Sequence, residues 1–420
     1  MLASADADVT WCEGVDLLML AERVGTPLHA YSANAIRARI RALKGAFDGL
    51  DVGICYAVKA NANVAILHLM DDAGLGADIV SVGELQRCLR AGILPGRIVF
   101  SGVGKQQDEI DVALAAGVAR FNVESFDELE LIERVAARRQ QIAIVAVRIN
   151  PDVDALTHAK ISTGKAENKF GVTLAEARRW FDSAAGRPHV QLDGLHVHIG
   201  SQLLDLAPLR QALRRVDAFR RELVAAGYLI RSIDVGGGLG VRYRDGEVPP
   251  TAQAYADVIR ETLGDFDGRI LLEPGRWLVA EAGVLLTRVI RVKHGESRCF
   301  LVLDAAMNDL ARPALYDAWH DIEPVSNRDR AARVYDVVGP VCETGDTFAA
   351  AREMPECRAG ELVMIRTTGA YGAAMASTYN ARPLAAEVLL DQGRYAVIRR
   401  RQSLDEMMAG EHAADRWETP

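Results

Sequence analysis

The sequence lacks the features that mark secreted, membrane-spanning or nucleic-acid-binding proteins. Its six cysteines contain no CxxC pair and are spread over 420 residues, which is too sparse for a disulfide scaffold and favours a reducing compartment. No apolar run reaches membrane-spanning length. The N-terminus has acidic residues but no basic one before Arg23, unlike a signal peptide. The net charge of −8 gives no reason to expect a nucleic acid or an anionic membrane as partner. We therefore expect a cytoplasmic protein.

What the sequence does contain is a regular alternation of short β-rich runs and stretches with apolar residues at helical spacing. Eight such units predict a TIM (β/α)8 barrel over residues 27–282, and the number eight disfavours the main alternative, a doubly wound open sheet. The length also exceeds that of a usual single domain, so a second, smaller domain is expected. The predicted strands are residues 52–57, 77–80, 97–100, 119–123, 142–149, 192–199, 230–235 and 269–272.

Beyond residue 283 the pattern changes to strand-like runs separated by glycine, proline and acidic turns. It predicts a mostly β C-terminal domain, a barrel or sandwich, over residues 283–420. We expect the N-terminal segment, residues 1–26, to pack with this domain. The predicted strands are residues 283–292, 300–303, 333–339, 361–367 and 395–399.

Polar residues follow nearly every predicted barrel strand. The active site of a TIM barrel lies at the C-terminal ends of its strands, so these side chains should meet on one rim. A single polar residue at a strand end would mean little, whereas this many indicate a functional site. They are Lys59, Asp78, Ser81, Ser101, Asn122, Glu124, Arg148, His198, Gly236–Gly238 and Glu273.

Lys59 ends the first predicted strand, in the stretch YAVKAN at residues 56–61. A desolvated lysine amine is the usual nucleophile for Schiff-base chemistry, because burial lowers its pKa. The alternative is a lysine whose ammonium group reaches the surface at a strand end. That stretch alone favours the surface lysine, and the convergence of polar residues on one rim favours the nucleophile.

Two histidines lie in HVHIGSQ, residues 196–202. A period of two places His196 and His198 on one face of the strand. They could be metal ligands, but no third ligand follows with a recognisable spacing, so we expect no metal. Stacking on a planar cofactor suits His198 better, and His196 suits a hydrogen-bonded interior position.

Two further motifs indicate a phosphorylated cofactor. The glycines of GGGLG, residues 236–240, let backbone N–H groups approach a phosphate, although a plain tight turn would look the same. They are not the dinucleotide fingerprint, because its third glycine position falls on Val241. In EPGR, residues 273–276, Glu273 could keep a pyridine nitrogen protonated, or form a surface pair with Arg276.

The predicted β domain supplies RPALY at residues 312–316, GPVCETGD at 339–346 and GAYG at 369–372. A cysteine and glutamate in a loop are usually incidental. Beside a site that forms a carbanion, however, the thiol of Cys342 is a candidate proton donor.

Together these motifs resemble the fold-type III decarboxylases that depend on pyridoxal 5'-phosphate (PLP), from about residue 27 to residue 400. Within that family, RPALY and the Cys–Glu pair are closest to the diaminopimelate branch. One departure is Val82, where relatives more often have glycine. The resemblance implies that Lys59 binds PLP as a Schiff base, that His198 stacks on the ring and that Cys342 supplies a proton. It also implies a homodimer in which Cys342 and Glu343 reach the neighbouring subunit's site.

The resemblance assigns further residues to the cofactor and to the substrate. The cofactor-binding residues are Lys59, Asp78, Arg148, His198, Ser201, Gly236, Gly237, Gly238, Glu273, Gly275, Arg276 and Tyr371. The substrate-binding residues are Arg276, Arg312, Tyr316, Glu343 and Tyr371.

The implied reaction is decarboxylation of meso-2,6-diaminopimelate to L-lysine and CO2, the last step of lysine biosynthesis. Its distal carboxylate requires arginine and its distal ammonium requires an acid, which Arg312 and Glu343 could supply. An ornithine site would need no extra arginine, and burying one opposite an amine would cost on the order of several kcal/mol. The alternatives are a decarboxylase of ornithine, arginine or carboxynorspermidine, and a non-catalytic regulatory relative, which would typically lack Lys59 or Cys342.

Overall fold

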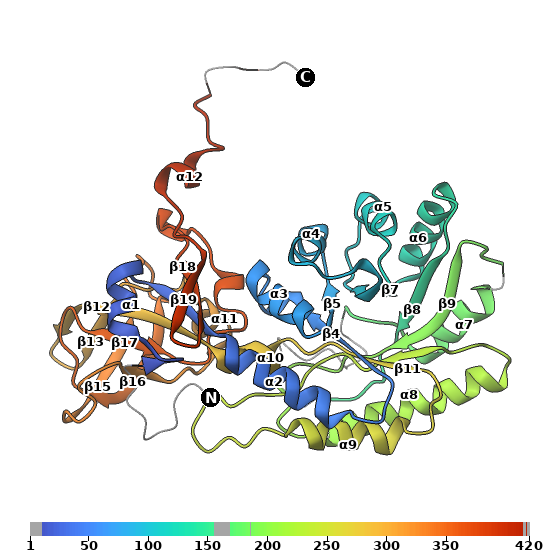
Figure 1. The fold of residues 1–420 in the computed structure, drawn as a ribbon, viewed down its shortest axis with the longest axis horizontal. Coiled ribbons are helices and arrows are strands. Elements are labelled where there is room, and N and C mark those ends of the chain that lie inside the picture. Colours follow the sequence, from blue (N-terminus) through green and yellow to red (C-terminus); the bar gives the residue numbers. More distant parts are fainter. Residues whose placement is uncertain (1–10, 155–168, 185, 415–416, 418–420) are drawn as a thin grey trace. The chain divides into compact units, whose positions relative to one another are not determined.

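The computed structural model describes residues 11–154, 169–184, 186–414 and 417. The chain divides into two compact units (Figure 1). One, the barrel unit, is Ala33–Glu281, and the other, the β unit, combines Met1–Ser32 with Ala282–Pro420. In the described ranges, no helix is both long and apolar enough to cross a membrane.

The barrel unit is a closed barrel of parallel strands in the order β10-β11-β4-β5-β6-β7-β8-β9. The prediction of a TIM barrel is confirmed, with a strand at each of the eight predicted positions. The predicted sixth strand extended to residue 199 but ends at His196, so His198 lies in the loop that follows. The strands are β4 Val52–Ala57, β5 Gly76–Ile79, β6 Ile98–Phe100, β7 Arg120–Val123, β8 Ala143–Arg148, β9 Val190–His196, β10 Ser232–Asp234 and β11 Arg269–Leu272.

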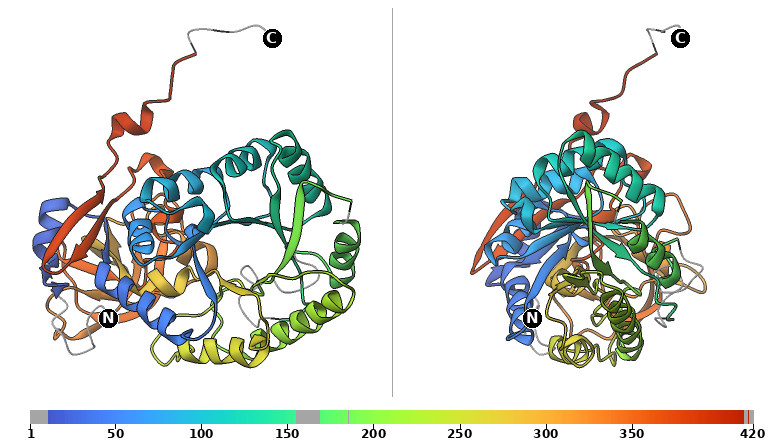
Figure 2. Two further views of the ribbon diagram at one scale, coloured as in Figure 1. Left: turned by 45° about the vertical axis from the view of Figure 1, so that its right-hand side comes forward. Right: turned by 90° about the vertical axis from the view of Figure 1, so that its right-hand side faces the viewer.

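Helices surround these strands, as the left view of Figure 2 shows. Several begin at a side-chain cap that accepts a hydrogen bond from a first-turn N–H group: Ser81 for α4, Ser125 for α6 and Thr251 for α9. Ser81, which we expected on the site rim, is therefore a helix cap. The helices are α2 Ala33–Ala46, α3 Val64–Asp72, α4 Val82–Ala91, α5 Gln107–Ala116, α6 Phe126–Arg138, α7 Leu174–Ala184, α8 Ala207–Ala225, α9 Ala252–Leu263 and α10 Arg276–Val279, with 3-10 turns η1 Val58–Ala60 and η2 Pro95–Arg97.

The β unit is built on a nine-stranded sheet. Its main path runs β16-β15-β13-β12-β3-β18-β19, and β17 pairs with both β12 and β14. The strands are β3 Leu28–Ser32, β12 Gly283–His294, β13 Cys299–Leu303, β14 Ile322–Pro324, β15 Ala332–Val338, β16 Thr347–Pro355, β17 Leu362–Ile365, β18 Ala386–Asp391 and β19 Arg394–Arg399. Smaller elements of this unit are β1 Trp11–Cys12, β2 Val15–Asp16, α1 Leu17–Val24, α11 Arg312–Tyr316, α12 Leu404–Met408 and the 3-10 turns η4 Ala373–Met375 and η5 Tyr379–Ala381. The 3-10 turn η3 Ala280–Ala282 contains the chain boundary between the barrel unit and the β unit.

The N-terminal boundary differs from the expected one. Residues 28–32, which we placed in the barrel, form β3 of the β unit, antiparallel to β12 and parallel to β18. All five are buried, so this short strand satisfies its backbone groups only within that sheet. Leu17 and Leu20 of α1 join a core cluster with Leu362 and Val388 of the same sheet. Residues 1–10 of the expected N-terminal segment lie outside the described residues.

Candidate active site

Lys59 lies in turn η1, directly after β4, at the C-terminal end of the barrel. Its Nζ atom donates to Oδ2 of Asp78 at 3.1 Å. Asp78 follows on the next strand, β5, and is fully buried. The lysine side chain itself is 42% exposed, so our expectation of a desolvated amine is wrong. A buried carboxylate, rather than burial of the lysine, defines the environment of this amine.

Beneath the rim lies a cluster of buried polar residues centred on Glu273. One carboxylate oxygen of Glu273 accepts from Ser101 Oγ at 3.3 Å and from Asn122 Nδ2 at 3.2 Å. The other lies 3.3 Å from Nε2 of His196. Asp234, at the end of β10, accepts from Asn122 Nδ2 at 3.4 Å. The strand ends thus bring residues from five separate parts of the chain into one buried network.

Burial shifts the protonation of this network. Burial, followed by the charge of Asp78, raises the pKa of Glu273 to about 7. Burial and the charge of Glu273 raise the pKa of Asp234 to about 7 as well. Burial lowers the pKa of His196 to about 4, so its imidazole is neutral at neutral pH. With a pKa near 7, and beside a second such acid and a neutral imidazole, Glu273 can hold a proton near neutral pH.

This cluster bears on our expectation that the site binds no metal. No third ligand for the histidine pair was visible in the sequence, yet His196, Asp234 and Glu273 bring their ligand atoms within 4.8 Å of one another. His198 is not part of the group. Asp234 and Glu273 are already hydrogen-bonded to Gly236 N and Asn122, so hydrogen bonding accounts for their arrangement without an ion.

The glycine loop after β10 lies against the neighbouring strand ends. Gly236 and Gly238 have positive φ angles of 68° and 110°, which favour glycine. A Cβ atom on Gly237 would lie 2.3 Å from the carbonyl oxygen of Glu273, and one on Gly238 would lie 2.5 Å from that of Gly200. Only glycine fits these positions without displacing backbone.

The loop is tied to the histidine and aspartate beside it. Gly237 N donates to His198 Nδ1 at 3.3 Å, and Gly236 N donates to Asp234 Oδ1 at 2.9 Å. Burial and the positive charges of Arg148 and Lys59 lower the pKa of His198 well below its ordinary value. His198 is therefore a neutral ring held next to the glycines.

The remaining barrel residues hold the rim together. Arg148, at the end of β8, donates to Glu124 at 3.0 Å, and both side chains are almost fully buried. Arg276 donates to the Tyr243 hydroxyl at 2.8 Å. Gly275 precedes α10 and faces Ala57 and Ala60, where a Cβ atom would lie 3.0 and 3.1 Å from their Cβ atoms. Ser201 lies partly exposed in the loop after β9.

The RPALY motif of the β unit forms helix α11. Arg312, in α11, is buried and donates from Nη1 to Nε2 of His320 at 2.9 Å. His320 Nδ1 in turn donates to the carbonyl oxygen of Arg366 at 2.8 Å, which fixes the tautomer that accepts from Arg312. Tyr316 ends the same helix and is partly exposed. His320 is a positioning residue that the sequence did not reveal, because its spacing from Arg312 matches no motif.

Cys342 and Glu343 lie exposed in a loop that Asp346 closes. The buried Asp346 carboxylate accepts from the N–H groups of Met307 and Val341, both at 2.7 Å. Cys342 N donates to Asn380 Oδ1 at 3.2 Å. The fixed loop presents its thiol and carboxylate to solvent.

Tyr371 and Tyr379 complete this group in the β unit. Tyr371 has a positive φ of 57°, a conformation that a tyrosine rarely adopts, and its side chain is partly exposed. A hydrogen bond to Glu343 raises the pKa of the Tyr379 hydroxyl. Tyr379, in the stretch STYNARP at residues 377–383, was not among the predicted site residues.

Comparisons with known proteins agree with this geometry. Residues 33–280 match the model of the family "Pyridoxal-dependent decarboxylase, pyridoxal binding domain". The chain is 50% identical over 406 residues to the diaminopimelate decarboxylase of Pseudomonas aeruginosa, with 97% of each chain covered. It belongs to the diaminopimelate decarboxylase family.

Solved structures of diaminopimelate decarboxylases have the same fold. The enzyme of Helicobacter pylori, complexed with L-lysine, has a TM-score of 0.91 and 43% identity, and the match covers 94% of this chain and 98% of that one. The enzyme of "m. jannaschi" has a TM-score of 0.92 and 37% identity, with 96% of each chain covered. The expected barrel with a mostly β second domain is thus confirmed.

The raised pKa of Glu273 leads to a pH prediction for protein prepared without PLP. A carboxyl whose pKa is higher in the folded state binds more protons there, so its stabilisation is complete below about pH 4.5 and is lost as pH rises through about 7. Glu273→Gln removes this titration and keeps an acceptor for Asn122. We expect the melting temperature to fall less between pH 5 and 8 in the variant, by on the order of 5 °C.

Glu222→Gln is the control for this experiment, because Glu222 is exposed on α8 of the same unit. Its melting temperature should follow that of the wild type at every pH. Parallel pH profiles for wild type and Glu273→Gln would show that Glu273 does not titrate in this range.

Proposed function

We propose that the protein is a PLP-dependent diaminopimelate decarboxylase. It removes the carboxylate at the D-centre of meso-diaminopimelate as CO2 and gives L-lysine, the last step of lysine biosynthesis. The observation that carries this proposal is the convergence of the Lys59 amine, the Asp78 carboxylate and the buried Glu273 at one end of the barrel. Membership of the diaminopimelate decarboxylase family supports the substrate.

The barrel residues fit PLP. Asp78 Oδ1 is buried and has no hydrogen-bond partner among the described residues, so one acceptor remains for a ligand. Gly236–Gly238 leave their backbone without covering side chains, as a phosphate cradle requires. Glu273 lies inward of them, and a carboxyl with a pKa near 7 can share a proton with a pyridine nitrogen. When bound, the cofactor supplies an electron sink for the carbanion that CO2 leaves behind.

Each barrel residue then has a role that its position supports. Lys59 would hold the cofactor covalently through its amine, and Asp78 would stabilise the ammonium form of the free side chain. The neutral ring of His198 would help to hold the cofactor. Arg148, held by Glu124, adds positive charge to the rim. The phosphate is bound by Ser201, Gly236, Gly237, Gly238, Gly275, Arg276 and Tyr371.

The β unit supplies the proton and the contacts to the distal end of the substrate. Cys342 donates the proton that replaces CO2, and its exposure in a fixed loop suits this role. Arg312 binds the distal carboxylate, and its contact with His320 fixes the direction of the guanidinium. Glu343 binds the distal ammonium, and Arg276, Tyr316 and Tyr371 complete the substrate contacts.

We also propose that the protein acts as a homodimer in the cytoplasm. Cys342 and Glu343 of one subunit complete the site of the other, as in the family that the motifs resemble. Their exposure on the β unit supports this arrangement, because neither residue is covered by its own unit. The absence of any basic surplus supports a small-molecule substrate and no nucleic acid or membrane partner.

The decisive experiment measures CO2 release by PLP-loaded protein from meso-diaminopimelate, ornithine and arginine in parallel. We expect release from diaminopimelate alone, with L-lysine as product. Lys59→Ala should reduce it by on the order of 10⁴-fold, because the amine acts covalently. Lys293→Ala, at an exposed lysine of the β unit, is the control. Release from ornithine or arginine alone would contradict the substrate, and no release from any of the three would indicate the non-catalytic alternative.

Arg312→Ala tests recognition of the distal carboxylate. Loss of a charged hydrogen bond should raise the KM for diaminopimelate roughly 10- to 100-fold, while PLP stays bound. The absorbance of the bound cofactor and the steady-state rate report the two effects separately. Arg291→Ala, at an exposed arginine on β12, should match the wild type. An unchanged KM for Arg312→Ala would refute the assignment.

A hybrid dimer tests the shared site. Lys59→Ala and Cys342→Ala are each expected to be inactive, but co-expressed they should recover about a quarter of the wild-type activity, because half of the dimers are hybrids with one intact site. Lys59→Ala co-expressed with Glu273→Ala is the matched control, since both residues lie in the barrel unit and no intact site can form. Equal, negligible activity in both mixtures would place Cys342 in its own subunit's site.

A further inference from the structure

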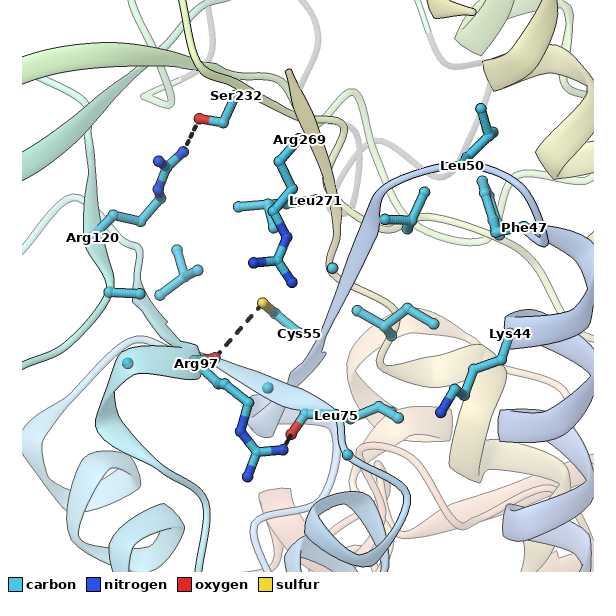
Figure 3. Close-up of a pocket in the computed structure, with 18 of the residues that line it drawn as sticks. Lys44, Phe47, Leu50, Cys55, Leu75, Arg97, Arg120, Ser232, Arg269 and Leu271 are labelled. Carbon is cyan, nitrogen blue, oxygen red and sulfur yellow. Dashed lines mark hydrogen bonds between the residues drawn. The ribbon is translucent and has the colours of Figure 1, made fainter. Parts of the chain in front are cut away.

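A second cavity lies in the barrel unit, at the end of the barrel opposite Lys59 and Glu273. Its volume is about 390 Å³, within the usual range for small-molecule pockets. The residues that line it come from the N-terminal parts of β4, β5, β6, β7, β10 and β11 and from the end of α2 and the loop that follows it. Figure 3 shows the side chains around it. None of them is among the residues proposed above for the cofactor or the substrate.

Glycines leave this space open. The interior of a TIM barrel is normally filled by layers of bulky side chains. Here Gly53 and Gly76, at the start of β4 and β5, contribute no side chain. A Cβ atom on them would lie 2.6 Å from Leu271 Cδ2 and 2.1 Å from the carbonyl oxygen of Arg97, respectively. The floor below them consists of Cys55, Val99 and Leu271, which form a small buried cluster. The cavity therefore has an apolar floor.

Positive charge surrounds the floor. The Arg120 side chain is only 11% exposed, and among the described residues its one hydrogen-bond acceptor is the Ser232 hydroxyl. Its distance to the nearest carboxylate, Asp193, is 3.7 Å. Arg231 lies 3.6 Å from the same carboxylate. A guanidinium has five N–H donors, so this buried group keeps most of its capacity for a ligand.

The charges around the cavity do not balance. Arg269 lies 3.8 Å from Asp51, so Arg120, Arg231 and Arg269 together face two carboxylates, Asp193 and Asp51, at distances beyond a hydrogen bond. Three positive groups against two negative ones leave one positive charge.

The other two cations of the lining do not add to this surplus. Arg97 pairs with Asp71 at 2.6 Å. Lys44 donates to the carbonyl oxygen of Ala73 at 3.0 Å, and Asp48 of the lining offsets its charge in the count.

We propose that this cavity binds a small monocarboxylate with an apolar body. The carboxylate group takes the donors of Arg120 and Arg269, whose planar forks match its two oxygens. The apolar body covers Val99, Leu271 and Cys55. A single surplus charge suits a monoanion, and the apolar floor disfavours a strongly hydrated dianion such as phosphate. This site is independent of the decarboxylase reaction and of the residues proposed for it.

Isothermal titration of the PLP-loaded enzyme with 4-bromobenzoate tests the proposal. We expect 4-bromobenzoate to bind, and 4-bromobenzyl alcohol and inorganic phosphate to bind at least about tenfold more weakly, because each lacks one half of the recognised chemistry. Arg120→Gln and the more exposed Arg269→Gln should each weaken binding roughly 10- to 100-fold, the contribution of a charged hydrogen bond. Arg291→Gln, at an exposed arginine on β12 that is not part of the cavity lining, should bind as the wild type does.

The position of the bromine decides whether binding occurs in this cavity. Crystals of the same enzyme grown with 4-bromobenzoate should give anomalous bromine signal between Val99 and Leu271. Signal only at the PLP end of the barrel, equal binding of the alcohol, or full affinity in both Arg120→Gln and Arg269→Gln would each overturn the proposal. Because Arg269 is 59% exposed, its variant should fold normally even where Arg120→Gln does not.

Discussion

The site depends on the ability of the barrel to keep an acid, Glu273, inside its strand ends. Burial and the charge of the neighbouring Asp78 disfavour its negative charge, and Asn122 and Ser101 hold its position. A buried carboxylate without such partners would be costly. The same arrangement explains the glycine loop, because Gly237 passes so close to the Glu273 carbonyl oxygen that no side chain fits. The position of the acid therefore also determines which residues the glycine loop can contain.

Lys59 differs from Glu273 in its exposure to solvent. Lys59 is partly exposed, and its partner Asp78 is fully buried. A buried carboxylate with one oxygen on the amine and the other without a partner can hold the ammonium in place and still contact a bound ligand. The strand order places β5 directly beside β4, so the pair requires no long connection. Parallel pairing of consecutive strands is thus what brings acid and amine together.

The sequence was sufficient for the barrel, because each strand is a short apolar run followed by an amphipathic helix. It was also sufficient for most of the rim, since Lys59, Asp78, Asn122 and Glu273 all lie in such runs or shortly after them. The sequence did not predict contacts between strands that lie far apart in the chain. β3 carries no signal that it joins a strand more than 250 residues away, and the partners of His196 come from different strands. The exposure of the Lys59 side chain could not be predicted from the sequence either, because it depends on how all the residues of the rim pack.

The two ends of the barrel use arginine in opposite ways. At the C-terminal end, Arg148 is paired with Glu124 at hydrogen-bond distance and both are buried, so its charge is balanced and its position fixed. At the N-terminal end, Arg120 is nearly as buried but lies 3.7 Å from a carboxylate that it shares with Arg231. Burying a charge with so little compensation is unfavourable unless another group completes it. Gly53 and Gly76, at the start of β4 and β5, add no side chain at this end, and a Cβ atom there would lie 2.6 Å from Leu271 Cδ2 and 2.1 Å from the carbonyl oxygen of Arg97.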